Sequence, residues 1–306
     1  MPLMIRPQPK LIFIGVISIL FLFSCGKRRT GIEEEIRKEL AKQPGTYGLA
    51  FKDLSTGEEL FINEHEIFHA ASTMKTPVMI EAFKQAKEGR FSLSDSVPIK
   101  NTFKSIVDGS EYSLDSAEDS EQKLYTLTST KRTLDSLVYD MIIVSSNLAT
   151  NIIIELVDAK KVTQSMRDLG ANDIQVLRGV EDDKAFIEGL INSTTPYDLM
   201  VIFEKMANGE TVSKQASDAM IDILLDQRFN TIIPAKLPKD VKVAHKTGSI
   251  KGVHHDSGIV FLPDGRKYVL VILSKNLKDD DAATAVMANV SEIIYKHVMG
   301  TNRSNQ

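Results

Sequence analysis

Apolar residues recur in residues 31–43 at the spacing of a helix face. Ile32, Ile36 and Leu40 are four positions apart, which is typical of one side of an amphipathic α-helix. The middle of the chain is also mostly helical by its pattern, and a last helix closes the chain. The further helices predicted are residues 72–87, 133–138, 145–157, 161–169, 196–207, 213–225 and 281–299.

Short apolar runs between turn-forming residues predict strands near both ends of the chain. Residues 47–52 and 58–63 are separated by the turn-rich segment 53–57, as in an antiparallel hairpin. Near the C-terminus the predicted strands are residues 241–247, 252–262 and 267–274, with a Pro-Asp-Gly turn between the last two.

This distribution predicts an α+β fold. An antiparallel sheet formed from both chain ends and flanked by helices, residues 31–66 and 238–301, receives an inserted all-helical lobe, residues 67–237. The acidic run at residues 116–121 is interpreted as a solvated surface loop. A cleft between two such lobes is where a substrate site is expected.

The first residues differ from the rest of the chain. Arg6 and Lys10 precede the apolar run 11–23, which is short for a membrane span and typical of a signal peptide. The run ends before Cys25, the only cysteine of the chain, in a context that resembles a bacterial lipobox. We therefore expect a lipoprotein-type signal peptide in residues 1–25, a tether in 26–30, a lipid anchor on the cysteine and a periplasmic or cell-envelope location, the alternative being an uncleaved anchor helix.

The composition of the chain limits the kinds of partner that we expect. The chain has 306 residues, 42% of them hydrophobic, and a formal net charge of −4, so it can bury a core and offers no clustered basic surface for nucleic acid. A single cysteine excludes an internal disulfide. We expect a monomer that binds a small molecule.

Candidate chemistry begins with a Ser-x-x-Lys at the start of an apolar helix. This spacing occurs three times, but only Ser72 and Lys75 stand at such a position. Three residues apart on a helix, the two side chains share a face, so the lysine amine can reach the serine hydroxyl. A buried lysine can have a lowered pKa and serve as a base. The alternative is a helix-capping serine beside a surface lysine.

Two further motifs follow in order. Ser145, Ser146 and Asn147 open a predicted helix, and Lys246-Thr247-Gly248 ends a predicted strand. Each is weak alone, since the first could be a helix cap and the second a solvated strand end. Together with Ser-x-x-Lys, this order and spacing resemble the serine β-lactamase and penicillin-binding-protein superfamily, and the class A β-lactamases most closely, over residues 31–299.

The resemblance implies roles for the reacting groups. Ser72 is then the acylated nucleophile and Lys75 its activating partner, while Ser145 passes a proton to the leaving nitrogen. The backbone N–H groups of Ser72 and Ser249 are then the oxyanion hole. No metal or organic cofactor is implied.

The resemblance also implies how the substrate is held. Asn147 then binds the side-chain amide of a β-lactam or a peptidoglycan-like substrate, and Lys246 and Thr247 bind its carboxylate. One departure is Ser146, because most class A enzymes have aspartate in the middle of Ser-x-Asn.

The deacylating base has two candidates in the sequence. Class A enzymes activate water with a loop glutamate in a Glu-x-x-Leu-Asn context, which this chain lacks. Glu181 is at the expected distance from Gly170, whereas Glu188 precedes Ile191 and Asn192 but lies close to the following helix. We favour Glu181 over Glu188 or neither; its competitor is that residues 181–183 are only a wet acidic loop.

Three functions therefore follow from the sequence. The first is a β-lactamase, the second a penicillin-binding or DD-peptidase or esterase-like hydrolase with slow deacylation, and the third a non-catalytic cell-envelope module. His254 and His255 are interpreted as polar strand residues rather than metal ligands. One of them, or Lys251, was a candidate for extra positive charge beside the carboxylate pocket.

Overall fold

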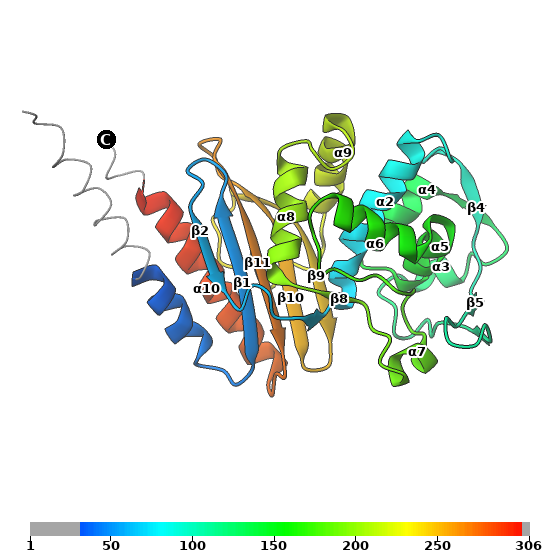
Figure 1. The fold of residues 1–306 in the computed structure, drawn as a ribbon, viewed down its shortest axis with the longest axis horizontal. Helices are drawn as coiled ribbons and strands as arrows, with labels where there is room; N and C mark the ends of the chain where they lie inside the picture. The colour runs from blue at the N-terminus through cyan, green and yellow to red at the C-terminus, as the bar shows by residue number, and fades with distance from the viewer. Residues whose placement is uncertain (1–30, 302–306) are drawn as a thin grey trace, which may run out of the picture.

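Five antiparallel strands form the centre of the computed structural model, which describes residues 31–301 (Figure 1). Their order across the sheet is β2-β1-β11-β10-β9, so strands from the two ends of the chain lie next to each other through the β1–β11 pairing. This confirms the predicted sheet. The strands are β1 (Thr46–Asp53), β2 (Glu59–Ile62), β9 (Lys242–Ile250), β10 (Val253–Phe261) and β11 (Lys267–Lys275).

Two terminal helices cover one face of the sheet (Figure 1). The helix at residues 31–40 buries Ile32, Ile36 and Leu40, the three residues that predicted it, in one core cluster with the sheet. The C-terminal helix α10 (Asp280–Thr301) contributes to the same cluster. The predicted terminal helices are therefore confirmed.

The other face of the sheet meets the inserted helices (Figure 1). All of them except the short helix at residues 183–187 contribute to a second core cluster with the residues of the sheet that point to this side. The helices are α2 (Lys75–Lys87), α3 (Gln122–Tyr125), α4 (Leu134–Ile143), α5 (Asn147–Val157), α6 (Ala159–Asp168), α7 (Asp183–Ile187), α8 (Pro196–Ala207) and α9 (Lys214–Leu225).

Helix α8 packs directly on the sheet, although its residues fall within the predicted helical lobe. A Cβ at Gly48 of β1 would lie 2.7 Å from Pro196 and 2.8 Å from Phe68. A glycine is therefore needed where the first turn of α8 meets the strand. Residues 67–237 are thus continuous in sequence, but part of this segment packs against the sheet.

The lobe predicted to be all-helical also contains short strand pairs. Within residues 31–301, each pair joins strands of two or three residues, too short to show an alternating pattern in the sequence. The pairs are β3 (Phe68–His69) with β8 (Ser193–Thr194), β4 (Ser96–Pro98) with β7 (Lys131–Thr133), and β5 (Phe103–Lys104) with β6 (Glu111–Tyr112).

The predicted signal peptide (1–25), the tether (26–30) and Cys25 lie outside the described residues. From residue 31 to residue 301, no helix combines the length and the apolar character needed to cross a membrane.

Candidate active site

Ser72 lies in a single 3-10 turn, η1 (Ala71–Met74), that runs directly into α2. Ala71 has a φ of 45°, in the left-handed region that non-glycine residues rarely adopt, so the backbone is strained just before Ser72. The N-cap residues of η1 and α2 are Ala70 and Met74, and neither makes a side-chain capping hydrogen bond. Ser72 is therefore not a capping serine.

Lys75 is completely buried, so it is not a surface lysine. Its Nζ donates to the Ser145 carbonyl at 2.7 Å, to Ser145 Oγ at 3.2 Å and to Asn147 Oδ1 at 2.9 Å. The sequence spacing predicted a contact with the Ser72 hydroxyl. Among the described residues, the hydrogen bonds of Lys75 go to Ser145 and Asn147 instead.

Both lysines of the site have lowered pKa values. Burial lowers the pKa of Lys75 to about 7, although the carboxylates of Asp119 and Glu181 act in the opposite direction. Burial also lowers the pKa of Lys246 well below its usual value, with a further contribution from the charge of Lys75 and an opposing one from Asp256. Lys75 is thus poised to exchange a proton near neutral pH.

Ser145 stands between these two lysines. Its φ is 58°, and helix α5 begins only at Asn147, with Ser146 as the N-cap residue that accepts from the N–H of Ala149. The Oγ of Ser145 accepts from Lys75 Nζ at 3.2 Å and from Lys246 Nζ at 3.0 Å. The predicted helix start at residue 145 is therefore two residues early, because the left-handed turn places Ser145 outside the helix.

Strand β9 forms one wall of the site. Lys246 is buried on it, and its Nζ donates to the carbonyl of Thr247 at 2.8 Å. A Cβ at Gly248 would lie 2.9 Å from the backbone nitrogen of Ser72, so only glycine lets the strand approach Ser72 so closely. Ser249 follows on the same strand and lines the cleft with Thr247.

A cleft of about 260 Å³ joins these elements. Its lining confirms that distant segments of the chain converge around Ser72. The lining residues are Ser72, Glu118, Ser120, Ser145, Asn147, Phe229, Thr231, Ile232, Thr247, Gly248, Ser249, His254 and His255.

Glu181 faces the same cluster from a loop. Its Oε1 accepts from Asn147 Nδ2 at 2.8 Å and its Oε2 from the N–H of Asp115 at 3.2 Å. Burial raises its pKa. Asn151 of α5 holds the loop by accepting from the N–H of Val180 at 2.7 Å and donating to the carbonyl of Val180 at 3.0 Å.

Residues 181–183 are not a wet acidic loop. Asp182 is buried, caps α7 through the N–H of Ala185, and accepts from Ser105 Oγ at 2.8 Å. Glu188 is exposed at the C-terminus of α7 and does not line the cleft. Of the two candidate glutamates, the structure places only Glu181 against Asn147.

The sequence predicts that the acidic run 116–121 is a solvated surface loop. This prediction is wrong for Asp119. Asp119 is only 4% exposed, and one carboxylate oxygen accepts from the N–H groups of Asn147 and Leu148 at 2.9 Å each. The hydroxyl of Tyr125 donates to the same oxygen at 2.9 Å. The free N–H groups at the start of α5 recruit this carboxylate, which no local sequence pattern reveals.

His255 does not provide the extra positive charge considered from the sequence. Burial lowers the pKa of His255 to about 4, and its Nε2 lies 2.8 Å from the carbonyl of His69. His254 contacts Thr284 Oγ1 at 2.7 Å, and Lys251 is exposed outside the cleft lining. Across residues 31–301, no three His, Cys, Asp or Glu side chains are grouped as metal ligands would be.

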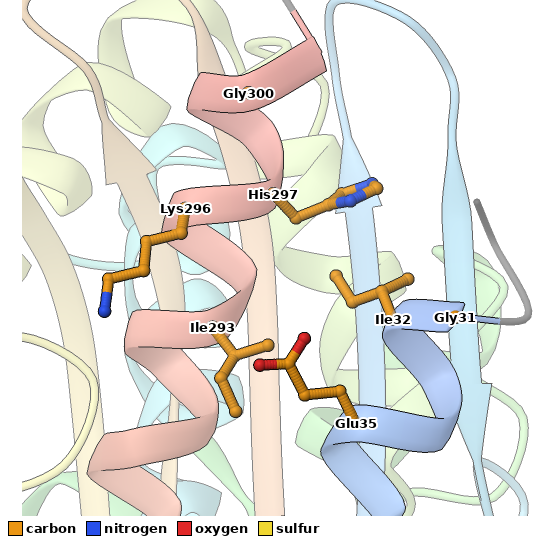
Figure 2. Close-up of a pocket in the computed structure, with 7 residues that line it drawn as sticks. All are labelled: Gly31, Ile32, Glu35, Ile293, Lys296, His297 and Gly300. Atoms are coloured by element: carbon orange, nitrogen blue, oxygen red, sulfur yellow. The ribbon is translucent and has the colours of Figure 1, made fainter.

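A larger hollow of about 520 Å³ lies on the opposite side of the sheet (Figure 2). It is formed by the N-terminal helix and α10, and it shares no lining residue with the cleft at Ser72. The residues that line it are Gly31, Ile32, Glu35, Ile293, Lys296, His297 and Gly300.

Fold and cleft together are those of an enzyme that acts through a serine nucleophile. The sequence model of the Beta-lactamase2 family, described as a beta-lactamase enzyme family, matches residues 31–298. The chain therefore belongs to the β-lactamase enzyme family and is a serine hydrolase, as the motifs predicted.

Individual relatives agree. A beta-lactamase of Bacteroides uniformis is 26% identical over 298 residues, which are 91% of this chain and 97% of the relative. The crystal structure of a beta-lactamase from Sphaerobacter thermophilus superposes with a TM-score of 0.73 at 25% identity, covering 85% of this chain and 95% of that one. A PBP-A variant, solved as an acyl-enzyme complex with penicillin G, has a TM-score of 0.74 at 30% identity, covering 89% and 97%.

Proposed function

We propose that this hydrolase opens β-lactam rings through an acyl intermediate on Ser72 and releases the acyl group with water activated by Glu181. The observation that carries this proposal is the chain of contacts from Glu181 through Asn147 to Lys75. It supports a base for the second half of the reaction beside the groups that serve the first half.

In the acylation step, neutral Lys75 takes the hydroxyl proton of Ser72 while Ser72 Oγ attacks the carbonyl carbon of the β-lactam. The backbone N–H groups of Ser72 and Ser249 stabilise the negative oxygen that forms. The C–N bond then breaks, and Ser145 gives its hydroxyl proton to the leaving nitrogen. The neighbouring amines of Lys75 and Lys246, at 3.2 and 3.0 Å from Ser145 Oγ, support the return of a proton to this hydroxyl.

In the deacylation step, ionised Glu181 takes a proton from a water molecule, whose oxygen attacks the acyl carbon. The bond to Ser72 Oγ breaks, and the proton that Glu181 took from the water is passed to this oxygen, which restores the serine and the ionised glutamate. The product carries a new carboxylate and the freed amine. Asn147 is assigned to the side-chain amide of the substrate, and Lys246 and Thr247 to its carboxylate.

Mass spectrometry of the purified protein at intervals after mixing with benzylpenicillin tests this function. We expect accumulation of penicilloate with at most a brief adduct on Ser72, and neither adduct nor product with Ser72→Ala. A stable adduct would instead indicate the penicillin-binding alternative. The similar PBP-A variant, which was solved as an acyl-enzyme complex with penicillin G, supports testing for this outcome. Absence of both adduct and turnover in the unaltered protein would contradict both.

The location of the protein is part of the proposal. The basic start, the apolar run 11–23 and Cys25 support export and lipid anchoring at the cell envelope. Palmitate labelling of cells that express the chain should give a labelled band that Cys25→Ala abolishes. Labelling that survives this substitution would refute an anchor at Cys25. We also propose a monomer, which sedimentation of the protein in detergent would test.

A further inference from the structure

Asp119 is the most highly coordinated carboxylate near the site. Its Oδ2 accepts from the N–H groups of Asn147 and Leu148 at 2.9 Å and from the hydroxyl of Tyr125 at 2.9 Å. Its Oδ1 accepts from the N–H of Glu121 at 3.0 Å. The carboxylate therefore joins the 116–121 loop to the first turn of α5, where the helix dipole favours a negative charge.

The middle residue of Ser-x-Asn lies beside this carboxylate. Ser146 is completely buried, and its Oγ is 3.4 Å from Asp119 Oδ2. A carboxylate at position 146 would lie beside that of Asp119, at the N-cap position of α5. Position 146, where most class A enzymes have aspartate, is therefore adjacent to the carboxylate of Asp119.

Asp119 affects both the position of Asn147 and the pKa of Lys75. It holds the backbone of Asn147, whose side chain contacts both Lys75 and Glu181. Its negative charge favours the protonated form of Lys75 and so raises the pKa of that amine. The residues on either side of it, Glu118 and Ser120, line the cleft.

We propose that Asp119 is the positioning carboxylate of this active site, which supplies from a separate loop the negative charge that most class A enzymes carry inside Ser-x-Asn. In this arrangement Asp119 fixes the place of Asn147 and sets the charge balance around Lys75. The inference rests on the proposed function, because its kinetic readouts use β-lactam turnover.

Moving the carboxylate tests the inference. The four proteins compared are the unaltered chain, Asp119→Ala, Ser146→Asp and the double variant. We expect Asp119→Ala to lower kcat/KM about 100-fold, because five donors lose their acceptor. Ser146→Asp alone should also reduce activity, because two buried carboxylates then stand side by side. The double variant should be at least about tenfold more active than Asp119→Ala.

The pH profile separates a charge effect from a merely structural one. Lys75 is faced by Glu181 from the loop, by Lys246 from β9 and by Asp119. Asp119→Asn keeps the shape but removes the charge, so the pKa of Lys75 falls and the acid limb of the acylation rate moves to lower pH. Glu181 moves the same way, because Asp119 also raises its pKa. Glu121→Gln, which removes the same charge from the same loop, is the matched control and should leave the limb in place.

Two results would overturn the inference: a double variant no more active than Asp119→Ala, or an Asp119→Asn protein with unchanged activity and limb. Thermal unfolding of the same four proteins gives a readout without catalysis, in which the double variant should be more stable than the sum of the two single changes predicts. Failure of the proposed function would be recognised differently, because the unaltered protein would then form no adduct and no product.

Discussion

Two walls of the active site, strand β9 and the loop that carries Glu181, are held in different ways. On the β9 side, Lys246, Thr247 and Gly248 pair in register with Ser257, Asp256 and His255 of β10, so a backbone ladder fixes their position. On the opposite side, residues 177–192 are held mainly by side chains that imitate backbone partners. The comparison teaches that one wall is built into the sheet, whereas the other depends on a few buried amides and carboxylates.

Asparagines perform much of this work in the loop wall. Asn192 Oδ1 accepts from the N–H groups of Leu177 and Arg178 at 2.8 and 3.2 Å, and Asn151 binds both polar groups of the Val180 backbone. A side-chain amide can replace a neighbouring strand because its N–H donors and its carbonyl acceptor lie in one plane, as those of a peptide group do. The two walls should therefore respond differently to substitution, the strand wall in acylation and the loop wall in deacylation.

The largest expected effect is on the loop wall. Glu181→Gln removes the base but keeps a partner for Asn147, so deacylation should slow about 1,000-fold while acylation changes little. Stopped-flow and mass spectrometry with benzylpenicillin measure the two steps separately. Glu188→Gln is the matched control and should behave like the unaltered protein. A variant with slowed acylation and a normal acyl-enzyme lifetime would contradict the role given to Glu181.

A smaller effect is expected from the strand wall. Gly248→Ala places a methyl group 2.9 Å from the backbone nitrogen of Ser72, so β9 must move away from Ser72 and separate the two proposed oxyanion donors, Ser249 on β9 and Ser72. Loss of one such donor predicts acylation slowed about 100-fold. Gly31→Ala, where a Cβ meets nothing within 4 Å, is the control. Normal acylation by Gly248→Ala would show that the strand wall is less rigid than its ladder implies.

Loosening the loop without touching a reacting group should have a milder effect. Asn151→Ala leaves the N–H of Val180 without its partner and its carbonyl with only the Tyr112 hydroxyl, which lowers the free energy of unfolding by about 2 kcal/mol. Deacylation should slow about tenfold, since Glu181 follows directly after Val180. Urea unfolding and acyl-enzyme lifetimes measure both quantities, with the exposed Asn208→Ala as control. Slower acylation alone would reverse the contrast between the walls.

The smallest effect concerns pH. Burial lowers the pKa of Lys75 to about 7, so its neutral, proton-accepting form is lost as the pH falls through that value. Acylation at pH 6.5 should thus be about fourfold below its high-pH limit. Because Glu181 raises the pKa of Lys75, Glu181→Gln should move this limb to lower pH. Single-turnover rates across pH 5–9 measure it, and a rate that rises with acidity would contradict lysine as the base.

Sequence reasoning worked best where chemistry depends on spacing along one element. Helical periodicity placed Ile32, Ile36 and Leu40 in the core, and the motif around Ser72 and Lys75 identified the centre of the cleft. It failed where a residue acts across the fold. The acidic run at 116–121 has the composition of a surface loop. Only the tertiary structure shows that Asp119 is buried against the N–H groups at the start of α5.

The sequence by itself therefore determined the α+β layout, the order of the three motifs and the hydrolase family, because local periodicity and short motifs carry that information. The tertiary structure decided the partners of each reacting group. It turned Lys75 toward Ser145 and Asn147, placed Glu181 rather than Glu188 against Asn147, and supplied Asp119 to α5. The physical reason is that hydrogen-bond partners and burial, which set position and pKa, come from segments that are far apart along the chain.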